Sequence, residues 1–358
     1  MRVWVDTTAA ADVVFFAPIV QRLESSGHTV TVTARRFASA DLVLRRYGLA
    51  AVLVGHHRGG GVAARAVGLA NRTRQLLGSA ADGRFDVAAG SHTSDFVLAG
   101  WTLGIPQMTF LDEDDLRKMP FSLRMADEVA VPDAIAREAL SALRPSPRRF
   151  VRYPGFKEEY YLHDIQPDPL VLRRLEVDDR HVVGVVRPSR SSGTATDAVP
   201  WSSETVLADF VREVAGRRNV TLVLLARDPE QRQLFLSLGA PGLVAPEGMV
   251  DGVGLIAAAD FVLGDGGIMT REAAALGTPA YIVAGHPLTA VDRALLKTGR
   301  LRLATGPDDL WLRKKDPRTA NREPRDPWIF VDELLALARR RPRRRRSDGS
   351  TGAERAIR

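Results

Sequence analysis

A glycine turn lies between a short apolar run and a helical pattern, and it limits the folds that this chain can adopt. The segment reads Gly264-Asp265-Gly266-Gly267-Ile268-Met269-Thr270-Arg271-Glu272-Ala273-Ala274-Ala275-Leu276-Gly277-Thr278-Pro279. Apolar runs at 261–263 and 280–283 flank it. Helical spacing begins at Met269, and Gly277 with Pro279 ends the helix. We therefore predict a strand–helix–strand unit at this place.

The chemistry of this turn points to an anionic ligand. Its glycines let the backbone approach a ligand, and the first N–H groups of the following helix favour an anion. The predicted diphosphate ligands are Gly266, Gly267, Met269 and Thr270. A carboxylate at Glu272 would repel phosphate, but it can accept hydrogen bonds from a ribose diol. Together these features suggest a nucleotide diphosphate. The alternative is a plain tight turn, with Glu272 as a helix N-terminal charge.

The same segment resembles the signature of an uncharacterised prokaryotic family in the GT-B superfamily. That superfamily contains MurG-type N-acetylglucosaminyltransferases and UDP-N-acetylglucosamine 2-epimerases. Further segments resemble the family in the same order, over residues 1–305: Val5-Asp6-Thr7, Val14-Phe15-Phe16-Ala17-Pro18-Ile19, Gly27-His28-Thr29-Val30, residues 151–159, Val186-Arg187-Pro188 and Val250-Asp251-Gly252. The resemblance implies a nucleotide-diphospho sugar as substrate, with a UDP-sugar favoured, and no required cofactor.

Short apolar runs alternate with helical patterns along most of the chain. Strands are predicted at 3–5, 29–33, 51–54, 85–89, 107–110, 128–131, 182–186, 221–225, 261–263 and 280–283. This alternation predicts an α/β fold with parallel sheets covered on both faces. The polar stretch from Glu158 to Pro169 divides it. We expect two Rossmann-like domains facing a central cleft, at residues 1–160 and 161–338, with the last helix returning to the first domain.

Composition limits the class of protein and its location. The 358 residues are 45% hydrophobic, which is enough for two cores. There is no cysteine, and this excludes disulfides and thiolate chemistry. The chain has no apolar run of the ~20 residues that a membrane span needs. A strand begins at Arg2, so no secretory signal precedes the fold. We therefore expect a cytoplasmic protein.

The net charge of +7 comes from the C-terminal tail alone. Residues 339–358 hold nine Arg against Asp348 and Glu354; removing them from 50 basic and 43 acidic residues leaves 41 of each. Such a segment is typical of a disordered extension. One interpretation is a solvated tail without specific function. The other is a weak contact with nucleic acid or an anionic membrane surface, which would make the protein peripheral to the membrane.

Two residues of the second domain join the predicted nucleotide site. Arg187 ends an apolar strand and precedes Pro188, where a cation suits a diphosphate across the cleft. The resemblance also places Arg187 in a nucleotide-facing loop, and the alternative is a surface salt bridge. Ser189 begins a long polar loop that we expect to close over the ligand.

The first domain offers candidates for acid–base chemistry. Asp6 ends the first strand, where we expect it to face the cleft and bind or deprotonate an acceptor hydroxyl. Asp12 stands where the family resemblance suggests His, and a helix-capping role is the alternative. His92 and Asp95 follow another strand, and His92 is the best imidazole candidate. Its alternative is a hydrogen-bonded loop residue.

An acidic run at residues 112–115 follows the strand at 107–110. Asp112 and Glu113 are the members that we expect near an acceptor. Four adjacent acids cannot converge on one ion, and GT-B enzymes usually need no metal, so we predict no metal site. Near the domain junction, Lys157-Glu158-Glu159 is interpreted as interdomain salt bridging rather than substrate contact.

These features favour a GT-B glycosyltransferase that moves a sugar from a nucleotide-diphospho sugar to an acceptor. Asp6, Asp12 or His92 would activate the acceptor hydroxyl. One alternative is an epimerase or hydrolase acting on the sugar nucleotide, using Asp95, Asp112, Glu113 and His92. Another is a non-catalytic nucleotide- or partner-binding protein on the same scaffold. The acceptor and the oligomeric state stay open.

Overall fold

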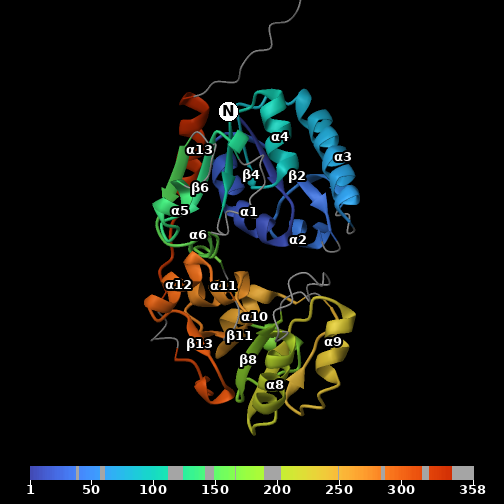
Figure 1. Ribbon diagram of the computed structural model, residues 1–358, viewed down its shortest axis with the longest axis vertical. Helices are drawn as coiled ribbons and strands as arrows, with labels where there is room; N and C mark the ends of the chain where they lie inside the picture. The colour runs from blue at the N-terminus through green and yellow to red at the C-terminus, as the bar shows by residue number, and fades with distance from the viewer. Residues whose placement is uncertain are drawn as a thin grey trace, which may run out of the picture.

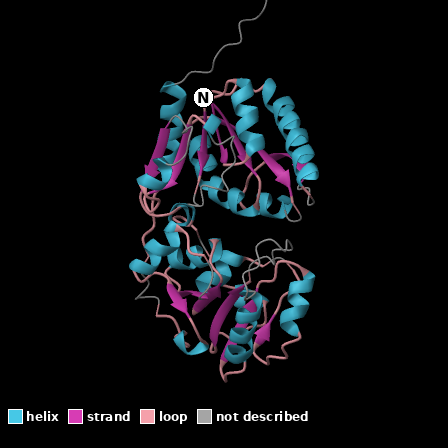
Figure 2. Ribbon diagram, viewed as in Figure 1, coloured by secondary structure: helices cyan, strands magenta, loops and turns pink. Residues whose placement is uncertain are grey.

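The computed structural model describes residues 1–37, 40–56, 61–111, 124–141, 149–165, 167–188, 203–248, 250–283, 287–316 and 322–340. Within this part of the chain, helices cover two parallel sheets, one in each half of an elongated molecule (Figure 1). Figure 2 shows that each sheet lies between helical layers. The predicted α/β class, with two Rossmann-like parallel-sheet domains, is confirmed.

The first sheet has seven strands in the order β3-β2-β1-β4-β5-β6-β7. Its strands are β1 (Arg2–Thr7), β2 (Thr29–Arg36), β3 (Ala51–His56), β4 (Val87–Ser91), β5 (Gln107–Phe110), β6 (Glu128–Pro132) and β7 (Arg149–Tyr153). Its helices are α1 (Ala10–Ser25), α2 (Ala40–Arg46), α3 (Val62–Ala81), α4 (Ser94–Leu103) and α5 (Arg137–Ser141). β1 pairs with β2 and β4, with Val3 opposite Val30 and Val87.

The second sheet has six strands in the order β10-β9-β8-β11-β12-β13. Its strands are β8 (Val182–Arg187), β9 (Val220–Leu224), β10 (Leu243–Val244), β11 (Phe261–Gly264), β12 (Ala280–Val283) and β13 (Arg302–Ala304). Its helices are α7 (Val171–Arg174), α8 (Ser203–Ala215), α9 (Pro229–Leu236), α10 (Gly252–Ala258), α11 (Ile268–Leu276) and α12 (Ala290–Lys297), with a 3₁₀ turn at Pro307–Asp309.

The central strands are apolar on both faces because helices cover both sides. Every residue of β9 and β11 is buried, as continuous apolar runs in parallel sheets predict. The elements that the sequence pattern missed are short or lie at a sheet edge. β7 is an edge strand in which Arg149 and Arg152 interrupt the apolar residues, so its apolar run is short. β13 has only three residues.

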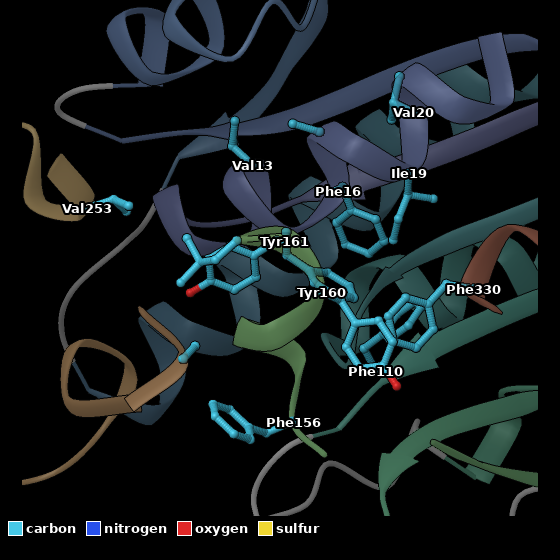
Figure 3. Packing of buried hydrophobic residues seen from close by; sticks show 14 of the residues in the cluster. Val13, Phe16, Ile19, Val20, Phe110, Phe156, Tyr160, Tyr161, Val253 and Phe330 are labelled. Atoms are coloured by element: carbon cyan, nitrogen blue, oxygen red, sulfur yellow. The ribbon is translucent and has the colours of Figure 1, made fainter. Parts of the chain in front are cut away.

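The chain crosses between the domains twice. The first crossing carries α6 (Lys157–Tyr161), and the second leads into α13 (Trp328–Arg340), which packs against α1, β4 and β5. The ring of Phe330 on α13 lies 5.6 Å from Phe15, 5.3 Å from Phe110 and 4.6 Å from Tyr160, centroid to centroid (Figure 3). The final helix therefore belongs to the core of the first domain.

Both crossings are fastened to one buried carboxylate. Glu159 Oε1 lies 2.5 Å from Arg300 Nη1, and Glu159 Oε2 lies 2.6 Å from Arg325 Nε. Gly155 must be glycine here, because its φ is 68° and a Cβ would lie 1.8 Å from Glu159 Oε2. For Glu159, the salt-bridging interpretation is confirmed.

The Arg-rich tail falls largely outside the described residues, which end at Arg340. That arginine closes α13 and donates to Glu128 Oε1 at 2.8 Å. Among the residues that the structure describes, none of the helices is long and apolar enough to cross a membrane.

Candidate active site

Each sheet has a point where the order of its strands reverses. In the first sheet β1 lies between β2 and β4, and in the second β8 lies between β9 and β11. In open parallel sheets, ligands bind at the carboxyl ends of the strands beside such a point. The segments that follow β4 and β11 therefore define the two walls of the candidate site.

The turn after β11 has the backbone of an anion site. Gly266 and Gly267 have φ of 97° and 92°, which favours glycine at both positions. Gly267 is the residue before α11, and a Cβ added to it would meet nothing within 4 Å. The turn thus faces open space at the positive end of a helix.

The other predicted turn residues have structural contacts. The Thr270 hydroxyl donates to the Gly267 carbonyl at 3.0 Å, and the side chain is buried. Gly264 lies inside β11, where a Cβ would approach the Arg187 carbonyl at 3.3 Å. Met269 is partly buried against the core. In this structure the Thr270 hydroxyl therefore stabilises the shape of the turn. Gly266 and Gly267 are the turn residues that remain as candidate ligand contacts.

Glu272 lies in the second turn of α11, one turn later than its predicted place at the helix N-terminus, and contacts the domain crossing. The Tyr161 hydroxyl donates to Glu272 Oε1 at 2.7 Å. Burial raises the pKa of Glu272 to about 7; the Tyr161 hydrogen bond opposes this, nearby Glu158 adds to it, and the charges of Lys157 and Arg187 oppose it. This carboxyl group beside the glycine turn therefore exchanges its proton near physiological pH.

Arg187 ends β8 next to the same helix. Its Nη1 donates to the carbonyls of Leu225 at 2.6 Å and Ala226 at 3.2 Å. Its charge lowers the pKa of Glu272, which places the guanidinium within electrostatic reach of that carboxylate. Ser189, the next predicted nucleotide residue, lies outside the described residues.

The first domain reaches this wall through the end of α2. Arg46 forms an ion pair with Asp251, the residue before α10. Burial raises the pKa of the neighbouring Tyr47 phenol, and the carboxylates of Asp251 and Glu272 raise it further. Tyr47 therefore lies within electrostatic reach of the predicted ribose carboxylate.

The wall of the first domain is built around a buried ion network. Arg72 of α3 lies 2.8 Å from Asp6 Oδ1 and 3.0 Å from Asp95 Oδ2, and Arg35 of β2 lies 2.7 Å from the same Asp95 oxygen. Thr33 donates to Asp6 Oδ1 at 2.6 Å. The structure thus brings Asp6 and Asp95 together through Arg72.

Asp6 was expected to face the cleft, and the structure differs on this point. Its side chain has no exposed area, because Arg72 covers it. Burial raises the pKa of Asp6 to about 6, although Arg72 opposes this. Burial also raises the pKa of Asp95, but Arg72 and Arg35 outweigh it and bring that pKa below its ordinary value. In this structure both carboxylates hold arginines; their predicted catalytic roles stay predictions.

Asp12 and His92 lie at the ends of neighbouring elements. Asp12 Oδ2 accepts from Thr8 N at 2.9 Å, Thr8 Oγ1 at 2.7 Å and Ala9 N at 3.1 Å, so this side chain closes the turn into α1. These contacts match the capping interpretation. His92 is partly buried after β4, with Nδ1 3.0 Å from the Phe110 carbonyl.

The remaining acidic candidates, Asp112 and Glu113, lie outside the described residues. Within the described part of the chain, no group of three His, Cys, Asp or Glu side chains is placed to hold a metal ion.

Sequence reasoning missed Arg72 and Tyr161. A signal for Arg72 was present: it shares one buried stripe of α3 with Leu76 and Ala80, at helical spacing. A charged residue on such a stripe indicates a buried partner. Tyr161 gave no comparable signal, because its partner is 111 residues away.

The two parallel-sheet domains have the GT-B fold. UDP-N-acetylglucosamine 2-epimerase from Neisseria meningitidis, solved with UDP-GlcNAc bound, is 14% identical and matches with a TM-score of 0.69 over 94% of this chain and 100% of its own. MurG from Acinetobacter baumannii is 14% identical, with a TM-score of 0.53 over 94% and 100%. Such low identity establishes the shared fold.

The family is shown by sequence. The model of the family described as "Protein of unknown function (DUF354)" matches residues 1–325, and the chain belongs to this family. Uncharacterized protein MJ0665 of Methanocaldococcus jannaschii is 24% identical over 307 residues, which cover 84% of this chain and 87% of that protein. The predicted resemblance to a GT-B family is thereby confirmed.

Proposed function

We propose that the protein is a sugar-nucleotide-dependent glycosyltransferase that takes a nucleotide-diphospho sugar, with UDP favoured as the nucleotide. The observation that carries this proposal is the pairing of the Gly266–Gly267 turn with Glu272 on the same helix. The turn offers N–H donors and open space to a diphosphate. The carboxylate lies one helical turn beyond, where a ribose diol would follow the phosphates.

The same arrangement suits cleavage of the bond between sugar and diphosphate. Negative charge develops on the leaving diphosphate as that bond breaks. The N-terminus of α11 would stabilise this charge without reorganising, because the first N–H groups of a helix are fixed in direction and have no partner within the helix. Arg187 adds a cation from the end of β8, within electrostatic reach of Glu272.

His92 is the candidate base for the acceptor hydroxyl. The Phe110 carbonyl can only accept a hydrogen bond, so the contact at 3.0 Å assigns the proton of neutral His92 to Nδ1. Nε2 then carries the lone pair that a general base needs. Asp6 and Asp95 are paired with arginines, whereas the described contact of His92 orients its ring through Nδ1 and does not involve Nε2.

A second candidate is an epimerase or hydrolase acting on the sugar nucleotide itself. The greater overall similarity to the Neisseria epimerase, with a TM-score of 0.69 against 0.53 for MurG, favours this candidate. The two are distinguished by incubating UDP-N-acetylglucosamine with the protein alone. Turnover without an acceptor supports the epimerase or hydrolase, and turnover only with an added acceptor supports the transferase.

Nucleotide binding is the first test of the proposal. Calorimetry with UDP, GDP, TDP and CMP is run on the wild type, on Glu272→Gln, and on Glu213→Gln as an exposed control. We expect one nucleotide diphosphate to bind selectively. Loss of the ribose contact in Glu272→Gln should weaken it by about 1–3 kcal/mol, with no change in the control. Absence of binding by all four nucleotides contradicts the proposal and favours a non-catalytic role.

A further inference from the structure

We propose that Tyr161 is a positioning residue that aims Glu272 at the ribose of the bound nucleotide and links this contact to the domain crossing. The inference rests on the proposed function of the α11 site. The inference adds Tyr161 to the candidate nucleotide site. This residue lies on α6, a helix that contacts both domains.

The contact is direct and rigidly anchored. Tyr161 Oη donates to Glu272 Oε1 at 2.7 Å. The residue is buried, with 5% of its surface exposed, and the ring centroid lies 6.4 Å from that of Phe15 in an edge-to-face arrangement. Such packing fixes the direction of the hydroxyl, because a buried ring cannot change rotamer without displacing its neighbours.

Tyr161 lies on a helix that contacts both domains, so its hydrogen bond with Glu272 connects the two domains. α6 follows the last strand of the first sheet and packs against α1 of the first domain and α11 of the second. Figure 3 shows that Tyr160 and Tyr161 diverge from this helix, Tyr160 toward Phe330 and Tyr161 away from it. A shift of the crossing would therefore move the partner of Glu272.

A phenol suits this task better than a cation does. It occupies one carboxylate oxygen and leaves Oε2 to accept from the diol, without neutralising the carboxylate. The other charged groups around Glu272 partly balance: Glu158 and Lys157 on α6, Arg187 at the end of β8, and the titratable Tyr47 just after α2. Tyr161 thus orients the group and stabilises its ionised form.

The chain supplies a matched control for a test of this role. Tyr160 precedes Tyr161 on α6, is buried, and donates its hydroxyl to the Pro154 carbonyl at 2.8 Å. Tyr160→Phe therefore removes a buried hydrogen bond from the same helix without touching Glu272. We would titrate UDP and pyrophosphate into the wild type, Tyr161→Phe, Tyr160→Phe, Glu272→Gln and the double variant Tyr161→Phe/Glu272→Gln, from pH 6 to pH 9.

The ionised carboxylate is the form that accepts from the diol, so UDP affinity should rise with pH through the titration of Glu272. In Tyr161→Phe the loss of the hydrogen bond should move this rise to higher pH. We expect UDP affinity to fall about fivefold to tenfold at pH 7 and to recover partly at pH 9. Pyrophosphate affinity should not change, and Tyr160→Phe should match the wild type.

The double variant separates positioning from a general structural effect. When Glu272 is already replaced, Tyr161→Phe should have little further effect on UDP binding. Equal UDP affinities and pH profiles in Tyr161→Phe and Tyr160→Phe, with Glu272→Gln still weakened, would overturn this inference and leave the proposed function standing. A pH-independent loss for both UDP and pyrophosphate would also overturn it. A folded wild type that binds no UDP would overturn both.

Discussion

The two walls of the candidate site occupy the same place in two similar sheets, and they are built in opposite ways. After β4, the first domain places Asp95 on α4 and ties it to Arg72 and Arg35. After β11, the second domain places two glycines with positive φ and then Glu272, whose described partner is a neutral phenol. Charges are paired internally on one wall, while backbone donors and a carboxylate are presented on the other.

This difference indicates a division of labour. A buried ion network holds a fixed geometry, because breaking one contact exposes an unpaired charge to a medium of low dielectric. A glycine turn with a neighbouring carboxylate keeps its polar groups available for a ligand. We infer that the first domain supplies a rigid surface for the acceptor side, and that the second domain supplies the nucleotide contacts.

The largest expected effect comes from breaking the rigid wall. Arg72→Met would leave Asp6 fully buried without its cation. We expect the free energy of unfolding to fall by about 3–5 kcal/mol, measured by urea denaturation. Arg74→Met on the same helix is the control, since that residue is exposed and should change stability little. Equal effects of the two substitutions would contradict the proposed role of Arg72.

The glycine wall should respond to a different change. Gly267→Ala places a Cβ at φ 92°, a conformation that side chains rarely adopt. We expect a loss of stability of about 1–3 kcal/mol, together with weaker binding of pyrophosphate and UDP because the turn must shift. Gly306→Ala is the control, since it also has open space around its Cβ and its φ is −152°. Unchanged pyrophosphate affinity in Gly267→Ala would remove the turn from the site.

The pH dependence of stability tests the raised pKa of Glu272 on the second wall. The pKa of Glu272 is about 7 in the native protein, against an ordinary value of 4.5. Native Glu272 therefore binds more protons than unfolded Glu272 between these values, so its contribution lowers the free energy of unfolding as pH rises. Glu272→Gln removes this contribution. Relative to the wild type, we expect the free energy of unfolding of the variant to rise by about 2–3 kcal/mol from pH 5 to pH 8.

The measurement is urea denaturation of both proteins at several pH values. Asp6 titrates in both and cancels from the difference. Glu213→Gln is again the control, because that carboxylate is exposed. A difference between the wild type and Glu272→Gln that does not vary from pH 5 to pH 8 would contradict a raised pKa for Glu272.

The strands of this fold could be predicted from sequence more completely than its site. The predicted strands at 107–110 and 280–283 coincide with β5 and β12, because buried parallel strands are continuous apolar runs. The turn before α11 was predicted from local glycines. By contrast, the partner of Asp6 on α3 is 66 residues away; local periodicity marks Arg72 as buried but does not identify its partner.

The same limit explains the mistaken placement of Asp6. Asp6 lies near the carboxyl end of β1, and this position predicted a carboxylate that faces the cleft. The backbone of Asp6 does lie at that end of the strand. The side chain is covered because Arg72 enters from α3 above it, and Gly55 leaves room for it, since a Cβ there would lie 2.9 Å from Arg72 Cγ. The close approach of Arg72 on α3 to Gly55 on β3 therefore determines that Asp6 is buried.

The smallest expected effect concerns the contact that joins the two walls. Arg46 pairs with Asp251 across the domains, but half of its side chain is exposed, so solvent screens the pair. Arg46→Gln should lower the free energy of unfolding by about 0–1 kcal/mol and leave pyrophosphate affinity unchanged. Arg45→Gln is the matched control, as the exposed preceding residue on α2. A much larger loss of UDP affinity in Arg46→Gln than in Arg45→Gln would show that the first domain contributes to nucleotide binding. That result would contradict the assignment of nucleotide contacts to the second domain alone, because α2 of the first domain would also contribute to them.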